Sequence, residues 1–153
     1  MIRQAEEKDY IQLANMKWQR CIDDYEDYGA KKPDDADKAA FISRFTQFLK
    51  TDKTHTPFVM EENGVIVSAM LVALIPKAPT PDCDTDYIAY LSNVYTLKEH
   101  RGKGKGAELL SEIKKYLEAR RCELMIVWPS KNATDWYKRN GFTADNSILE
   151  CDL

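Results

Sequence analysis

Six consecutive residues at positions 101–106, called the glycine turn below, could bind an anion. Basic side chains alternate with glycines in the order Arg101, Gly102, Lys103, Gly104, Lys105 and Gly106. Glycines at this spacing allow positive φ angles and let backbone N–H groups approach a ligand closely. An amphipathic helix is expected directly after the turn, so the positive end of a helix dipole would add to the basic charge. The segment therefore predicts a phosphate site, and a diphosphate is the ligand that suits it.

Two common phosphate loops do not match the glycine turn. A Walker A loop ends in Gly-Lys-Ser/Thr, whereas Gly106 is followed by Ala107 and Glu108, so the lysine and the magnesium-binding hydroxyl are missing. The dinucleotide fingerprint G-x-G-x-x-G also fails, because a single residue separates Gly104 from Gly106. A nucleoside triphosphatase and a nicotinamide-dependent enzyme are both disfavoured.

The turn resembles the Arg/Gln-x-x-Gly-x-Gly/Ala loop of the GNAT superfamily of N-acetyltransferases. The motif positions are occupied by Arg101, Gly104 and Gly106. Residues 133–142 are similar to a second motif of that superfamily, A-x-x-x-Y-x-x-x-G-F, with Tyr137 as its tyrosine. In element order the resemblance spans nearly the whole chain, and its specific motifs lie within residues 90–142. It implies a GNAT fold and a reaction that moves the acetyl group of acetyl-CoA to an amine, without a metal.

The resemblance also assigns the residues of the donor site. Two strands of the superfamily splay apart at a bulge, and the pantetheine arm of the donor lies between them. The implied donor-binding residues are Val94, Tyr95, Thr96, Arg101, Gly102, Lys103, Gly104, Lys105, Gly106, Ala107 and Asn132. Tyr137 is implied as the general acid that protonates the departing thiolate. A core tyrosine is the alternative for Tyr137, because Trp136 beside it is equally aromatic, and a helix N-cap is the alternative for Asn132.

The sequence contains fewer signals for the binding site of the amine acceptor than for that of the donor. In these enzymes the acceptor usually lies between the first two helices and the loop before the fourth strand. Asp24, Tyr25 and Tyr28 fall in that region and would suit a cationic amine by charge and by cation–π contact. A solvated helix end is the alternative interpretation of such an acidic run. The expected fourth strand carries no carboxylate, so a water chain is the expected route for the proton of the amine.

Three functions remain open from the sequence. The leading hypothesis is an N-acetyltransferase that acts on a primary amine of a small molecule by direct attack. A protein lysine or N-terminal acetyltransferase is an alternative, and a non-catalytic acyl-CoA-binding regulatory module is another, which the missing carboxylate motivates. Dimers are frequent in the superfamily, so a homodimer is a further hypothesis.

The spacing of apolar residues predicts the elements that position these groups. Apolar residues at helical spacing indicate helices that start at Asp9 and at residues 37, 107 and 132, while β-branched and aromatic runs indicate strands. Asn63-Gly64 is a strong hairpin signal between two of these strands. The expected strands span residues 1–4, 56–61, 65–74, 87–96, 123–128 and 147–152, and the later helices span residues 37–50, 107–120 and 132–140. The acidic segment 23–29 is expected between the first two helices, and residues 124–127 are expected to be buried.

These elements predict one α/β domain of the α+β type over residues 1–153. With the resemblance, we expect a mixed sheet of about six to seven strands, splayed between strands four and five, and about four helices. A length of 153 residues is typical of one domain. The formal net charge of −3 argues against a nucleic-acid partner, and no apolar run reaches the length of a membrane helix. Scattered cysteines and the acidic N-terminal segment indicate free thiols and a cytoplasmic location.

Overall fold

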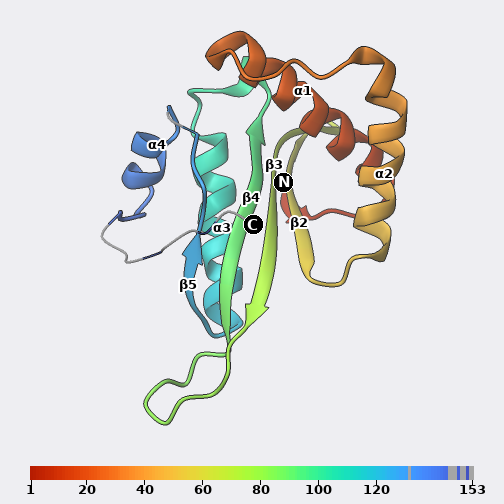
Figure 1. Cartoon of the computed structure of the whole chain (residues 1–153). Coiled ribbons are helices and arrows are strands. Elements are labelled where there is room, and N and C mark those ends of the chain that lie inside the picture. Colours follow the sequence, from red (N-terminus) through yellow and green to blue (C-terminus); the bar gives the residue numbers. More distant parts are fainter. Residues whose placement is uncertain (131, 145–147, 149–150, 152–153) are drawn as a thin grey trace.

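The computed structural model describes residues 1–130, 132–144, 148 and 151 of the chain. Its elements follow the order expected from the sequence (Figure 1). They are β1 (Ile2–Gln4), η1 (Glu7–Asp9), α1 (Tyr10–Tyr28), η2 (Asp35–Asp37), α2 (Lys38–Thr51), β2 (His55–Glu62), β3 (Val65–Pro76), β4 (Tyr87–Thr96), η3 (Lys98–His100), α3 (Lys105–Ala119), β5 (Cys122–Ile126) and α4 (Thr134–Arg139).

The strands form one mixed sheet in the order β1-β2-β3-β4-β5. Neighbouring strands are antiparallel except β4 and β5, which are parallel. The β2–β3 hairpin turns at Asn63 and Gly64, whose φ angles are 51° and 79°, as the Asn-Gly signal predicts. A parallel β4–β5 pair requires a crossover, and α3 provides it.

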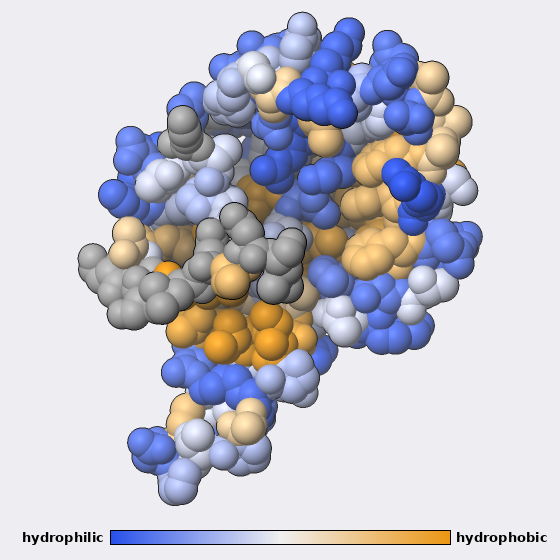
Figure 2. Space-filling view, viewed as in Figure 1, coloured by the Kyte–Doolittle hydropathy of each residue, from blue (hydrophilic) through white to orange (hydrophobic). Residues whose placement is uncertain are grey.

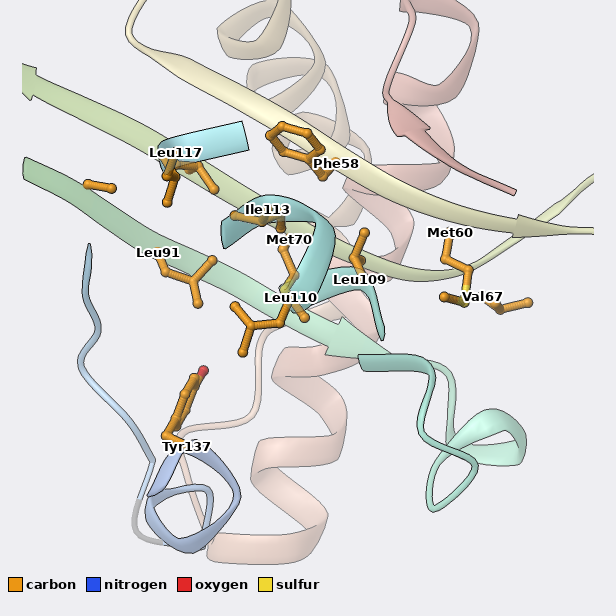
Figure 3. Close-up of a cluster of buried hydrophobic side chains, with 12 residues drawn as sticks. Phe58, Met60, Val67, Met70, Leu91, Leu109, Leu110, Ile113, Leu117 and Tyr137 are labelled. Carbon is orange, nitrogen blue, oxygen red and sulfur yellow. The ribbon is translucent and has the colours of Figure 1, made fainter. Parts of the chain in front are cut away.

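Helices cover both faces of this sheet. Figure 1 shows α1 and α2 together on one side and α3 on the other. Helix α3 buries Leu109, Leu110 and Ile113 against the face of the sheet that it covers. The strand residues on this face include Met70 and Leu91 (Figure 3). Because successive residues of a strand point to opposite faces, β3 also supplies the second core, which packs against α1 and α2. The two cores fix the central strands, and therefore the end of β4, between the helices.

Helix α1 is longer than the sequence interpretation allows. The acidic segment 23–29 belongs to the last turns of α1, which ends at Gly29 with a φ of 67°. The N–H of Gly29 donates to the carbonyl of Tyr25 at 3.0 Å, which closes the helix. The prediction that residues 23–29 lie between the first two helices is therefore wrong. The helix continues because its last part is anchored inside the protein through Asp23, which is 2% exposed.

The described residues form five strands, fewer than the six or seven expected. The expected closing strand at residues 147–152 falls mostly outside the described residues. The expectation that residues 124–127 are buried is also wrong. Leu124 is 46% exposed in β5, the last strand of the described sheet, and residues 125–127 are only partly buried. Figure 2 shows an apolar area in the lower part of the molecule. Leu124 of β5 and Ile75 of β3 are among the exposed large apolar residues.

Candidate donor and acceptor site

Strands β4 and β5 pair only along the first part of β4. Their pairing ends at Tyr90 and Ile126, whereas β4 continues to Thr96. On the other edge of β4, the register with β3 shifts so that Asn93 and Val94 together face a single β3 residue. Asn93 has a φ of 49°, which marks this position as a β-bulge. The end of β4 therefore exposes backbone groups that no described strand takes up on the β5 side.

The glycine turn follows β4 and leads directly into α3. Gly102 and Gly104 have φ angles of 72° and 77°, and Gly104 is the N-cap of α3. A β-carbon built on either glycine would meet no atom within 4 Å, so this face of the turn is open. The first N–H groups of a helix have no partner within the helix, and here those of Lys105 to Ala107 lie at the open end. This cradle fits the diphosphate of CoA, which accepts hydrogen bonds from such N–H groups.

The basic side chains of the turn have partners within the protein. Arg101 Nη2 donates to Asp23 Oδ2 at 2.6 Å, and Lys105 is paired with Glu62. Lys103 Nζ donates to the carbonyl oxygen of Glu99 at 2.8 Å. The sequence predicts that these cations bind the diphosphate. In the structure, each of them also contacts an oxygen atom of the protein, which the sequence does not predict.

A cavity of about 500 Å³ lies at the meeting point of the glycine turn, the β4 bulge, the end of α1 and α4, and we call it the turn cavity. Most of the predicted site residues line it: Asp24, Tyr28, Val94, Tyr95, Thr96, Arg101, Gly102, Gly104, Lys105, Gly106, Ala107 and Tyr137. Lys103, Asn132 and Tyr25 do not line it, and Tyr25 instead lies under the ammonium of Lys32 at 5.9 Å.

Eight further residues line the turn cavity and lie outside the predicted site: Arg20, Asp23, Asp27, His100, Trp128, Ser130, Ala133 and Trp136. Arg20 Nη1 donates to the carbonyl of Val94 at 3.3 Å and so holds the bulge. The Trp128 ring lies edge-on to Tyr90, with 4.8 Å between the centroids. The acidic segment contains Asp23 and Asp27, so a signal for these two is present in the sequence. Arg20 lies before this segment, and its contact with β4 is a tertiary feature.

Tyr137 is a buried residue that lines the turn cavity. Only 7% of the residue is exposed, and its ring packs edge-on against Trp136 and Phe142. Figure 3 shows the ring rising from α4 with the hydroxyl directed toward the sheet and Leu110. Among the described residues, no group forms a hydrogen bond with this hydroxyl, although buried polar groups usually have a partner. Burial raises the pKa of Tyr137, so the hydroxyl stays protonated.

A comparison with protein families gives the identity of the fold. The sequence matches the acetyltransferase (GNAT) family over residues 13–142, which is most of the chain. The chain belongs to this family. Its GNAT fold explains the splayed β4 and β5, and acetyl-CoA is the acyl donor that enzymes of this family use. Among curated proteins, none matches the sequence significantly.

Solved structures show the same GNAT fold. A protein from Clostridium acetobutylicum, described as a predicted acetyltransferase and determined with acetyl-CoA, is 24% identical with a TM-score of 0.77, covering 99% of this chain and 95% of that one. A GCN5-related N-acetyltransferase from Ralstonia eutropha is 18% identical with a TM-score of 0.76, covering 100% and 97%. Glucosamine-6-phosphate N-acetyltransferase from Arabidopsis thaliana is 18% identical with a TM-score of 0.70, with the same coverage.

The part of the chain that the structure describes contains no group of three or more His, Cys, Asp or Glu side chains that could hold a metal ion. None of the helices in this part is both long and apolar enough to span a membrane. Cys21, Cys83 and Cys122 are free thiols, as the scattered positions of the cysteines predict.

Proposed function

We propose that this GNAT protein transfers the acetyl group of acetyl-CoA to a primary amine of a small molecule by direct attack, with Tyr137 as general acid. One observation carries the proposal. Tyr137 is a buried residue that lines the cavity with the glycine turn and the β4 bulge, and its hydroxyl is protonated and has no hydrogen-bond partner among the described residues. A hydroxyl in this condition is free to donate to a ligand.

The donor would lie along the turn and the end of β4. The N–H groups from Gly102 to Ala107 would hold the diphosphate, and the backbone of Val94 to Thr96 would hold the pantetheine arm. A backbone N–H at the bulge would stabilise the negative charge that develops on the thioester oxygen. Lys103 and Asn132 stay predictions of the sequence, because neither lines the turn cavity.

The reaction then needs proton transfers at the sulfur and at the nitrogen. The amine nitrogen forms a bond to the acetyl carbon, the carbon–sulfur bond breaks, and Tyr137 gives its proton to the departing thiolate. At the nitrogen, a cationic amine must lose one proton before the attack. It loses a second proton as the amide forms, and this second proton replaces the one that Tyr137 gives to the sulfur. Since β4 carries no carboxylate, we assign the transfers at the nitrogen to water in the turn cavity.

The acceptor would enter from the end of α1. Asp24 and Tyr28 line the turn cavity, and Asp27 adds a second carboxylate to the same wall. Acidic and aromatic side chains attract a cationic amine by charge and by cation–π contact. Tyr25, which points to Lys32, is the weakest of the three predicted acceptor residues.

An acetylation screen tests the proposal. Purified protein and acetyl-CoA are incubated with amino acids, polyamines, aminosugars and aminoglycosides, and free CoA and acetylated product are measured by mass spectrometry. Turnover with a small amine is the expected result. Tight CoA binding without turnover on any amine would favour a regulatory module, and a mass increase on cellular proteins alone would favour a protein acetyltransferase. A cytoplasmic location and a homodimer stay predictions from the sequence.

A further inference from the structure

Asp23 of α1 is a buried carboxylate that gathers donors from four separate segments. Gln19 Nε2 donates to Oδ1 at 3.0 Å, and Tyr95 Oη donates to Oδ2 at 2.9 Å. Arg101 Nη2 donates to the same Oδ2 at 2.6 Å, while Lys98 Nζ lies 3.4 Å from Oδ1. Burial alone would raise the pKa of Asp23, but these hydrogen bonds together hold the pKa below its usual value. The carboxylate is therefore charged and fully engaged at neutral pH.

Arg101 is fixed on three sides by this arrangement. Besides its bond to Asp23, its Nε donates to the carbonyl oxygen of Thr96 at 2.9 Å. Its guanidinium carbon lies 5.3 Å from the centre of the Tyr95 ring. A planar guanidinium held by a carboxylate, a carbonyl and an aromatic face has little rotational freedom. The residue that begins the glycine turn is thereby attached to the strand that precedes it.

The same part of α1 reaches the other subsites. Arg20, one helical turn before Asp23, holds the bulge through the carbonyl of Val94. Asp24, the next residue, lines the acceptor side of the turn cavity. Asp23 thus lies where the acceptor-facing helix, the bulged strand and the glycine turn are joined.

We propose that Asp23 is a positioning residue for the donor site, which acts by holding Arg101 against Tyr95 and Thr96. In this arrangement Arg101 is a tether that fixes the shape of the glycine turn, and backbone N–H groups rather than its guanidinium bind the diphosphate. The proposal rests on the donor site described under the proposed function and adds a residue and a role to it.

The experiment measures the dissociation constant for CoA by isothermal titration, which needs no acceptor. The variants are Asp23→Asn, Arg101→Gln and the double variant. Glutamine at position 101 keeps a residue that the GNAT motif accepts but removes the charge. Glu26→Gln is the matched control, because Glu26 lies on the same helix and pairs with Lys98 without touching Arg101.

We expect each single variant to weaken CoA binding by about tenfold, because a charge-assisted hydrogen bond that fixes the turn is lost. The double variant should bind no more weakly than either single variant, since both changes break the same contact. The control should bind like the wild type. Arg101→Gln should also leave the salt dependence of CoA binding unchanged, because a tether does not contact the phosphates.

If the losses of CoA affinity in the two single variants add up in the double variant, the proposal is overturned. A weaker salt dependence of CoA binding in Arg101→Gln would also overturn it, because this result indicates a direct contact between Arg101 and a phosphate. If Asp23→Asn does not fold, Tyr95→Phe replaces it, because this change removes a single hydrogen bond to Asp23. We expect about threefold weaker CoA binding from it, and unchanged binding counts against the proposal. A wild-type protein that does not bind CoA would refute the donor site itself, and this result is distinct from wild-type binding with unaffected variants.

Discussion

Replacing Tyr137 with phenylalanine removes the one hydroxyl on which the proposed mechanism depends. The ring keeps its contacts with Trp136 and Phe142, at centroid distances of 5.0 and 5.2 Å. Because none of the described residues bonds to the hydroxyl, the free energy of unfolding should stay within about 0.5 kcal/mol of the wild type. A change in rate can therefore be separated from a change in fold.

The expected loss is in turnover. General acids contribute about 10² to 10⁴ in rate. A thiolate is a better leaving group than an alkoxide, so we place Tyr137→Phe at the lower end, a loss of about 100-fold in kcat, or about 2.7 kcal/mol. The KM for acetyl-CoA should change little, because the glycine turn and β4 are intact.

The pH profile gives a second test of the same residue. Burial raises the pKa of Tyr137 above its ordinary value, so the hydroxyl keeps its proton to a higher pH than a solvated tyrosine does. In the wild type, kcat should show no decrease from loss of this proton below about pH 10. A fall in kcat near neutral pH that disappears in Tyr137→Phe would contradict this assignment.

The assay should follow the loss of thioester absorbance rather than a thiol reagent, because Cys21, Cys83 and Cys122 of the protein are free thiols that would also react with the reagent. Tyr116→Phe is the matched control, since this tyrosine lies on α3 outside the turn cavity. Its kcat should equal that of the wild type. If Tyr137→Phe turns over at the wild-type rate with the same KM, Tyr137 has no part in the chemistry and is a core residue.

Three further changes test the donor cradle and the fold. Gly104→Val places a side chain at a φ of 77°, so we expect CoA binding to weaken at least about tenfold. Gly64→Val is its control, because Gly64 lies in the hairpin at a φ of 79° and should carry a similar strain of about 1–3 kcal/mol. The control should keep the CoA affinity of the wild type. Asp9→Asn breaks a pair with Arg3 at 2.6 Å and should lower the free energy of unfolding by about 2 kcal/mol in urea melts. That difference should be present above about pH 4 and be lost as pH falls further, because the Arg3 hydrogen bond lowers the pKa of Asp9. Ile113→Ala empties a fully buried site in α3, and a loss of about 2–5 kcal/mol is expected in the same melts.

Local sequence patterns predict most of the helices and strands, but they do not predict contacts between segments that are distant in the sequence. The bounds of β4 match the expected residues 87–96, and the Asn-Gly signal correctly places the β2–β3 hairpin. The end of α1 shows what a local pattern cannot give. An acidic run predicts a solvated segment, but Asp23 is buried because Tyr95 and Arg101, which lie 72 and 78 residues away in sequence, supply its hydrogen bonds. Only the fold brings these partners together.

The pairing of the cations changes how the glycine turn recognises its ligand. Arg101, Lys103 and Lys105 lie within five residues, and without partners they would repel one another and oppose folding of the turn before any ligand binds. Asp23 and Glu62, from α1 and β2, offset the charge of Arg101 and Lys105. The backbone of the turn stays open at Gly102 and Gly104, although Arg101 and Lys105 also line the turn cavity. We therefore expect geometry to contribute more than net charge to binding of the diphosphate, and a side chain at Gly104 should weaken CoA binding more than neutralising Lys105 does.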